Sequence, residues 1–432
     1  MALGVAARAP YAMIPLGTMT AFTVSSGSVA TGGLAAGLVA ATSAVAGPLI
    51  GRAADRIGPR PVLLALTPLN AVMLSLLLVA ALQGWVGPAL WAVCIGTGAT
   101  AIPVGSFARV RWVALARDPR DLATALSYES TIDEMSFVLG PALVGIAASS
   151  AFPAAPLALA ALLVAVAGIP FAATTRRETP PAEPARTITG EIPAIGAVAS
   201  EVPLSSTEQP TGDPAERSAG APAGSPASRG PVAHPPIPRV LLAVLPAVIV
   251  MTCIGVFFGS VQAGTTERAV LAGAAGSAGL VYAVMGISSA IMALLVVMLP
   301  ASFTTAARIL VGGLGMLAFI ALTAPLTGLG LTTVMLLGAG VFIGPTLVTA
   351  FTLAQQRTPP GGTGVAMTSM QSSVTVGQAA GSSVGGALAA GIGPAGAFGL
   401  AALVSLIVAS VGAAALRRRA RRAVDSGSAR SS

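Results

Sequence analysis

Long apolar runs separated by short polar stretches fill almost all of this 432-residue chain. A run of about 20 residues lets an α-helix cross the hydrocarbon core of a bilayer. We identify twelve such runs, at residues 2–24, 30–52, 61–83, 86–114, 122–148, 154–174, 239–263, 273–299, 306–326, 329–355, 363–390 and 395–416. Backbone groups in hydrocarbon need internal hydrogen bonds, and no run alternates as membrane-barrel strands do. The pattern predicts an all-α polytopic membrane protein with twelve transmembrane helices.

The stretch 176–238 differs from these runs because it is rich in Pro, Ala, Ser, Thr and Glu and has almost no aromatic residues. It has too little apolar surface to fold on itself, so we predict a disordered cytoplasmic linker. The chain then divides into an N-terminal six-helix half (1–175), the linker (176–238), a C-terminal six-helix half (239–416) and a basic cytoplasmic tail (417–432).

The two halves repeat short sequences at a nearly constant spacing. The segment 36–39 recurs as 278–281, an offset of 242. At an offset of 241, Ala125, Gly140 and Gly145 match Ala366, Gly381 and Gly386. The shared offset predicts two pseudo-symmetric halves, with a substrate site between them near the middle of the membrane.

Charge is scarce, at 9% of residues against roughly 25% in a soluble domain. The arginines that follow even-numbered runs or the last run are Arg52, Arg56, Arg60, Arg117, Arg120, Arg176, Arg177, Arg357, Arg417, Arg418, Arg419, Arg421 and Arg422. Loops after odd-numbered runs are almost bare, and Arg268 beside Glu267 is the exception. The positive-inside rule then predicts a multi-pass protein of the cytoplasmic (inner) membrane with both termini cytoplasmic. Because the arginines flank spans, we expect a lipid partner and no nucleic acid.

The loop 51–60 concentrates charge between two apolar runs. Its pattern Gly51, Asp55, Arg56, Gly58 and Arg60 resembles the loop between helices 2 and 3 of the major facilitator superfamily of secondary transporters, here of bacterial type. The resemblance implies the twelve-helix fold of that family. It also implies a conformational latch in this loop that works as the transporter switches between inward-open and outward-open states.

Two departures limit the latch and the family pattern. Pro59 stands where the family usually has a basic residue, and the equivalent loop of the second half has Arg308 but no acid. We therefore expect a latch on one side only.

A second motif lies in the fifth run, where Gly140-Pro141-Ala142-Leu143-Val144-Gly145 resembles the Gly-Pro motif of many antiporters of the family. The family form usually ends in two glycines, and Val144 replaces the first. Proline kinks a helix and small residues allow close helix packing. A similar stripe is formed by Gly377, Gly381 and Gly385, for which we favour helix packing over ligand contact.

The fifth run also carries three acids, Glu129, Asp133 and Glu134. Charges inside a span are costly, at roughly 2.5 to 3.5 kcal/mol each, and suggest function. The candidate cationic partners are Arg8, Arg109 and Arg111. The matching second-half positions carry no charge, so the scaffold does not require these residues.

Two interpretations of this charge network stay open. In one, Asp133 or Glu134 binds the proton that drives transport. In the other, the network is a static set of ion pairs that fixes helices, and Glu129 and Arg109 fit this role better because they lie nearer the interface.

No nucleotide loop, metal cluster or nucleophile triad is found in the sequence, so we predict a transporter driven by an ion gradient, not an enzyme, with no cofactor. The candidate cavity residues are Tyr11, Tyr128, Tyr282, Gln371 and Gln378. With few aromatic residues and several methionines, this cavity favours an amphipathic or hydrophobic small molecule as the substrate. We predict efflux of that substrate, coupled to protons. We expect the transporter to be a monomer. Uptake of a metabolite is the alternative, and a non-transporting membrane receptor or scaffold is a remote one.

Overall fold

The computed structural model of the chain describes residues 2–108, 132, 136, 139–150, 152–175, 235–298, 300, 303–359 and 362–428. In the first half the helices are α1 (Ala2–Ser26), α2 (Val29–Ile57), α3 (Pro59–Leu82), α4 (Pro88–Ala99), the helix Leu139–Ser150, α7 (Ala155–Leu163), the π-helical turn η1 (Val164–Gly168) and α8 (Ile169–Thr174). In the second half they are α9 (Ile237–Leu271), η2 (Ala275–Ser277), α10 (Ala278–Leu295), η3 (Val296–Met298), α11 (Thr305–Thr323), α12 (Leu329–Arg357), α13 (Thr363–Ile392) and α14 (Pro394–Ser428). Every regular element within the described ranges is helical, which confirms the all-α fold class.

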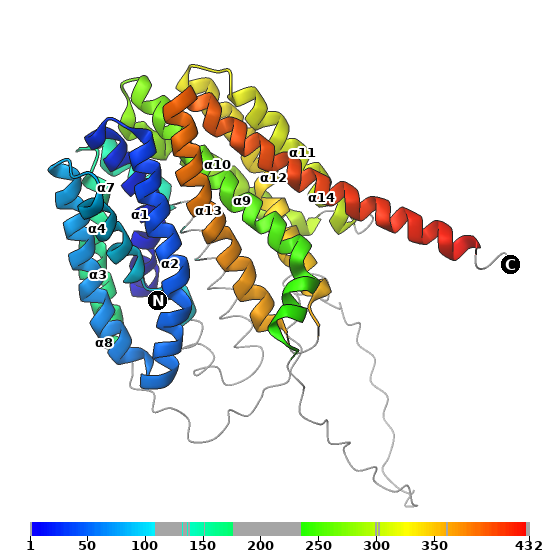
Figure 1. Ribbon diagram of the computed structural model, residues 1–432, viewed down its shortest axis with the longest axis horizontal. Coiled ribbons are helices and arrows are strands. Elements are labelled where there is room, and N and C mark those ends of the chain that lie inside the picture. The colour runs from blue at the N-terminus through cyan, green and yellow to red at the C-terminus, as the bar shows by residue number, and fades with distance from the viewer. Residues whose placement is uncertain are drawn as a thin grey trace, which may run out of the picture.

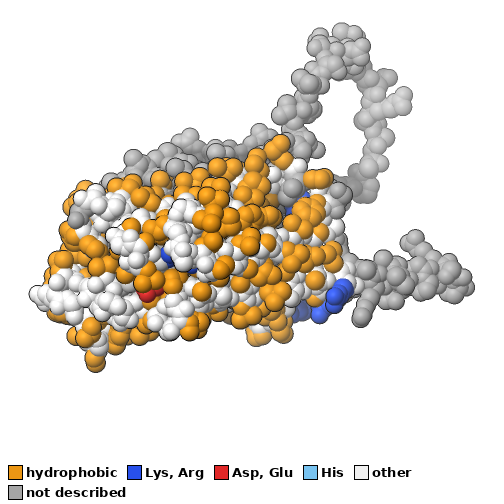
Figure 2. Space-filling view, turned by 90° about the horizontal axis from the view of Figure 1, so that it is seen from above, with side chains coloured by type: hydrophobic (Ala, Val, Ile, Leu, Met, Phe, Trp, Pro, Cys, Tyr) orange, Lys and Arg blue, Asp and Glu red, His pale blue; other side chains and the backbone are white. Residues whose placement is uncertain are grey.

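Nine of the helical segments in the described part of the chain are long and apolar enough to cross a membrane. Their outward faces carry large apolar side chains, including Leu242 at 71% and Leu294 at 69% exposed. Figure 2 shows hydrophobic side chains spread over one face of the molecule with few charged ones among them. A soluble domain rarely exposes so large an apolar surface, and such a surface is typical of a protein that spans a membrane.

Two short turns show how the sequence ends one helix and begins the next. Gly58 has φ of 89° and Gly87 has φ of 72°, values that favour glycine. Each is followed at once by a proline that begins the next helix, Pro59 in α3 and Pro88 in α4. Proline suits this first helical position because its missing N–H has no helical partner there. The glycine–proline pairs therefore fix these helix boundaries.

The helices run back and forth between two ends of the bundle (Figure 1). One end, which we call the arginine end, is marked by Arg52, Arg56, Arg60, Arg239, Arg308 and Arg357. The other, which we call the seam end, is marked by the turns at Gly27, Gly84, Gly273 and Gly393. Figure 1 shows the two halves side by side, with α2 next to α13 toward the seam end and the two helices farther apart toward the arginine end.

The apolar core has two main parts, and the larger one also includes Met13, Leu16 and Val144 of the first half. The larger one surrounds α9, where Ile254 and Phe257 are fully buried and pack with residues of α10 to α14. In the first half, Leu74, Leu77 and Leu90 join α3 and α4 to α1 and α7. A smaller cluster joins the halves at the seam end and contains Met19, Val29, Ala36, Ala263, Ala389 and Ala397.

The position of Arg268 corrects the sequence interpretation, which placed this residue in a loop after the seventh run. It lies inside α9 and is 3% exposed. Its guanidinium donates to the carbonyl of Thr323 at 3.0 Å, the hydroxyl of Thr332 at 2.8 Å and the carbonyl of Ala324 at 3.2 Å. It also lies 4.7 Å from the ring centre of Phe398. The last carbonyls of α11 attract a cation, so α9 can continue past a charged residue.

Two other runs differ from their predicted limits. The fourth run, expected as one helix over 86–114, is interrupted because α4 ends at Ala99 and residues 101–103 are not helical. The last run does not end at 416, because α14 continues through Arg417 and Arg418 to Ser428.

Candidate functional site

The two halves meet most closely where α2 crosses α13. A Cβ atom added at Gly33 would lie 2.9 Å from the Cα of Gly386, and one added at Gly37 would lie 2.8 Å from the carbonyl oxygen of Ala379. These distances are shorter than real Cβ contacts, so only glycine lets the two backbones come this close.

A second contact of the same kind joins the helix Leu139–Ser150 to α10. A Cβ atom at Gly279 would lie 2.8 Å from the Cα of Gly145 and 2.5 Å from the carbonyl oxygen of Pro141. Gly279 follows Gly37 by 242 residues, which is the offset of the internal repeat. We call the two contacts together the seam, defined by Gly33, Gly37 and Gly386 and by Gly145 and Gly279.

Among the described residues, the seam contacts lie at one end of the interface between the halves. At steps of four residues beyond Gly37 toward the arginine end, Ala41 is exposed, Val45 is 67% exposed and Leu49 is 60% exposed. A Cβ atom at Gly47 would meet nothing within 4 Å. The separation of α2 and α13 in Figure 1 agrees with these exposures. In the described part of the chain, α2 and α13 are therefore in contact at the seam end and apart toward the arginine end.

Several polar side chains are buried near the seam without hydrogen-bond partners for their oxygens. The buried side-chain oxygens that have no hydrogen-bond partner in the described structure belong to Thr18, Thr20, Thr23, Asn70, Gln262, Thr265, Thr266 and Ser382, all at most 4% exposed; all but Asn70 lie in α1, α9 or α13. At an offset of 242, Thr20 matches Gln262 and Thr23 matches Thr265. Buried polar atoms usually have partners, so their concentration here requires an explanation. The sequence analysis missed these residues because threonine is common in membrane helices.

The candidate charge network falls mostly outside the described residues, which do not include Arg109, Arg111, Glu129, Asp133 and Glu134. Arg8 is described, in α1, and is 5% exposed. The Arg8 side chain therefore lies inside the protein.

The candidate latch lies at the arginine end of α2. Gly58 donates its N–H to the carbonyl of Ala54 at 2.9 Å and ends the helix. Arg56 is exposed, Gly51 and Arg60 are half-buried, and the side chain of Asp55 is outside the described part. In the second half, Arg308 in the first turn of α11 donates from Nε to the carbonyl of Phe303 at 2.8 Å, just before that helix.

The predicted packing motifs lie at helix contacts. A Cβ atom at Gly140 would lie 2.9 Å from the backbone of Ala12 in α1. Along α13, Gly377, Gly381 and Gly385 all face α9, with added Cβ atoms 3.0, 2.8 and 2.9 Å from the Cα atoms of Gly255, Val256 and Ser260. This stripe therefore holds α13 against α9 within the second half.

The candidate cavity residues are not brought together. The hydroxyl of Tyr11 lies against the backbone of Ile102, and that of Tyr282 lies against the side chain of Gln262. Gln371 is exposed and Gln378 is half-buried on α13, whereas Tyr128 lies outside the described residues. Both described tyrosines are thus engaged by neighbouring helices.

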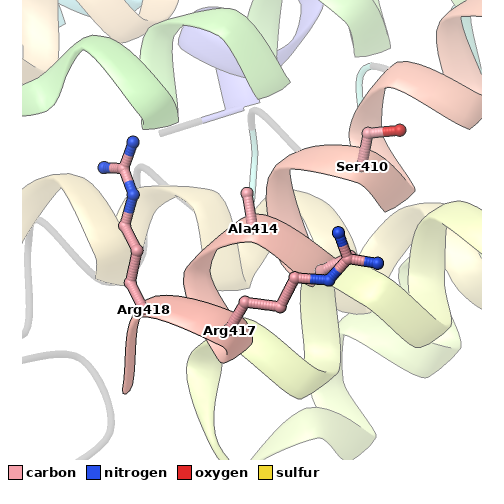
Figure 3. Close-up of a pocket in the computed structure, with 5 residues that line it drawn as sticks. Ser410, Ala414, Arg417 and Arg418 are labelled. Carbon is pink, nitrogen blue, oxygen red and sulfur yellow. The ribbon is translucent and has the colours of Figure 1, made fainter. Parts of the chain in front are cut away.

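A groove lies at the arginine end of α14. It has a volume of about 330 Å³ and is lined by Ser410, Ala413, Ala414, Arg417 and Arg418. Figure 3 shows the side chains of Arg417 and Arg418 extending away from α14. Both are exposed, so this surface presents two cations where the helix leaves the bundle.

Similarity to solved structures agrees with this geometry. The chain resembles the nucleoside transporter NupG with a TM-score of 0.63 at 12% identity, covering 96% of each chain. It resembles the POT family transporter PepTSo with a TM-score of 0.61 at 13% identity, covering 96% of this chain and 97% of that one. For the human organic anion transporter MFSD10 (TETRAN), the TM-score is 0.55 at 14% identity, with 95% and 97% covered. At such identities the likeness shows the fold, which is that of multi-pass transporters.

The sequence itself matches the family model of the Major Facilitator Superfamily over residues 1–374. This chain therefore belongs to that family and is a transporter, not an enzyme. A search of curated proteins by sequence finds no match.

Proposed function

We propose that this protein is a secondary active transporter that exports an amphipathic or hydrophobic small molecule by alternating access, driven by protons. The observation that carries the proposal is the one-sided closure of the interface: glycines pack tightly at the seam, while Val45 and Leu49 are exposed beyond it. A pathway between two halves needs a contact that can close one end while the other is apart.

The polar atoms near the seam support a second conformation. An unpartnered buried polar group costs about 1–3 kcal/mol. Thr20, Thr23 and Thr266 bear this cost while the seam is closed, and water would satisfy their hydroxyls once it opened. Their burial thus lowers the difference in free energy between the closed and open seam.

The orientation follows from the arginines. The positive-inside rule puts the arginine end, with Arg52, Arg56 and Arg357, in the cytoplasm of a cytoplasmic membrane. The conformation described above is then closed to the outside. Arg417 and Arg418 would lie at the headgroups of the inner leaflet, where each arginine contributes about 1 kcal/mol of attraction to anionic lipid.

Proton coupling rests on the span-5 acids. Neutral Asp133→Asn and Glu134→Gln variants should each be compared with the parent protein in proteoliposomes that carry an imposed pH gradient. We expect at least one to lose pH-driven transport of ethidium, an amphipathic cation, by about tenfold, since a tenfold change needs only about 1.4 kcal/mol. Thr375→Val is the matched control, because Thr375 follows Glu134 by 241 residues. Undiminished coupling in both acid variants would refute the proton role.

The same vesicles separate export from the alternatives. Ethidium that leaves the arginine side while protons move toward that side supports export. Substrate moving with the protons supports metabolite uptake, for which nucleosides and peptides are the first compounds to test. Saturable binding with no flux of any compound would favour a receptor or scaffold. Cross-linking of the reconstituted protein tests the expected monomer.

A further inference from the structure

The fourth span is interrupted deep in the membrane. Thr100 lies 12 residues after Pro88, the start of the candidate span, or about 18 Å along a helix. That is more than half of a hydrocarbon core of about 30 Å. Irregular backbone at this depth is tolerated only where protein or a cavity surrounds it. Ala101 and Ile102 are 7% and 3% exposed, so protein surrounds this break.

Asn70 of α3 donates a hydrogen bond to a backbone carbonyl of α4 that would otherwise accept a bond within that helix. Its Nδ2 atom donates to the carbonyl of Thr97 at 3.1 Å and to the hydroxyl of Thr100 at 2.9 Å. In a continuous helix the carbonyl of Thr97 accepts from the N–H of Ala101. Here that N–H donates to the carbonyl of Gly98 at 3.1 Å. Asn70 is fully buried, so its two bonds form without competition from water.

Tyr11 of α1 engages the break from the other side. Its hydroxyl lies against the backbone of Ile102. The carbonyl of Ile102 accepts from the N–H of Val104 at 2.9 Å, and Pro103 has no N–H to donate. Two neighbouring helices therefore supply partners for backbone groups that a helix would pair internally.

The second half contains the same proline without the break. Pro345 follows Pro103 by 242 residues, yet α12 runs unbroken from Leu329 to Arg357. The residue 242 after Asn70 is Gly312, which has no side chain, and the one 242 after Tyr11 is Cys253, whose thiol is a weak donor. Proline alone therefore does not divide this helix, and the difference lies in the side chains around it.

We propose that Asn70 and Tyr11 are positioning residues that keep span 4 in two pieces, and that the piece beginning at Val104 changes its angle to α4 during transport while α12 stays one rigid helix. Bending at residues 101–103 breaks no further helical hydrogen bond, because those bonds are already replaced. Short irregular segments that absorb backbone rotation are the usual hinges of domain motion. The inference concerns the transport cycle of the family and holds whatever the substrate, direction or coupling ion.

The test compares two matched pairs of spin labels in the full-length protein in phosphatidylcholine–phosphatidylglycerol vesicles. One pair replaces Ala92 and Ser106, across the break, and the other replaces Val334 and Val348, at the same positions 242 residues later. Both use a Cys94→Ala, Cys253→Ala background. In an unbroken helix each pair is about 21 Å apart. Gly37→Trp opens the seam without a substrate, because no side chain fits there.

We expect Gly37→Trp to shift the distance for the first pair by about 3 Å and to leave the second pair within about 1 Å. Asn70→Gly, which gives the first half the residue of the second, and Tyr11→Phe, which removes only a hydroxyl, should each reduce the shift. Amide exchange in residues 99–104 should also slow toward that of residues 341–346, because the helix can then pair its own groups. Ser75→Ala, an exposed position of α3 whose hydroxyl bonds within its own helix, should change neither.

Two results would overturn the proposal: equal shifts in the two pairs, or a shift and exchange rates that persist in both Asn70→Gly and Tyr11→Phe. If Asn70→Gly aggregates on size-exclusion chromatography, Tyr11→Phe decides the question, because it keeps the aromatic ring in place. A label distance across span 4 that shifts in the parent protein and not in Tyr11→Phe supports the proposal.

Discussion

Spans 4 and 10 occupy matching places in the two halves, carry a proline at the same repeat position, and yet have different structures. Around Pro345 the helix is continuous, whereas at Pro103 it is interrupted. The neighbours of the two prolines differ. At the break, Asn70 donates hydrogen bonds to α4 and the hydroxyl of Tyr11 lies against the backbone of Ile102. In the second half, Gly312 lies against α12 and has no side chain. The comparison teaches that the helix packed beside a proline decides whether the proline bends or divides a span.

The second half has its own reinforcement at a place where the first half has none. Arg268 joins α9 to α11, α12 and α14 through three hydrogen bonds and the ring of Phe398. The residue 242 before it is Ser26, whose hydroxyl bonds to the carbonyl of Phe22 in its own helix. One half is therefore tied together at the seam end, and the other contains a break.

The largest effect is expected at the seam, where the halves are alike. Gly37→Trp and Gly279→Trp, which are repeat equivalents, should both prevent closure, because overpacking costs about 1–3 kcal/mol and 1.4 kcal/mol is a factor of ten. Cysteines at Thr20 or Thr266 should then react about tenfold faster with an impermeant maleimide added at the seam end. Gly47→Trp, on the same helix but with open space around it, is the control. Unchanged labelling would contradict the seam.

The next largest effect is a difference in stability between matching substitutions in the two halves. Arg268→Ala removes three hydrogen bonds and the contact with the Phe398 ring, and should lower the free energy of unfolding by about 3 kcal/mol, measured by denaturant titration of the protein in mixed micelles. Ser26→Ala removes only local bonds, to the carbonyl of Phe22 and to the backbone of Ser28, and should cost about 1 kcal/mol. Arg268→Lys, which keeps the charge but not the planar fork, should fall between them. Equal costs for the two alanine variants would remove the asymmetry.

The latch should also be one-sided. Arg56→Gln should slow transport about tenfold if its pairing stabilises one state by about 1.4 kcal/mol. Arg308→Gln should change the rate about twofold or less, because Arg308 lies in the first turn of α11 and bonds to the carbonyl of Phe303 just before that helix. Rates of ethidium movement into proteoliposomes measure both. A larger loss at Arg308 would reverse this assignment.

The smallest effect tests the prolines themselves. Pro345→Ala restores one backbone bond in α12 and should slow amide exchange there by an amount worth about 1 kcal/mol. Pro103→Ala should leave exchange around span 4 unchanged, because Asn70 and Tyr11 still occupy the backbone groups. Mass spectrometry of residues 99–104 and 341–346 compares them. If Pro103→Ala slows amide exchange in residues 99–104, the proline itself is the cause of the break.

Much of the fold followed from local pattern. The limits of α2, α3 and α12 lie within a few residues of the predicted runs, because apolar length and glycine–proline turns are properties of a short segment. The seam could have been found as well: Gly37 and Gly279 both lie in the repeated segment, which served only to establish the offset. The break could not, since nothing near Pro103 distinguishes it from Pro345 without knowing which side chains of α1 and α3 lie beside it.

The sequence by itself determined that this protein crosses a membrane, that it has two related halves and that it belongs to a transporter family. These properties depend on hydropathy, which adds along a segment, and on motifs that are read residue by residue. Only the tertiary structure decided which end is closed, why Arg268 lies inside a helix and where span 4 divides. In each case a side chain from one helix pairs with the backbone of another or is left out to let it approach, and such pairing depends on contacts between distant parts of the chain.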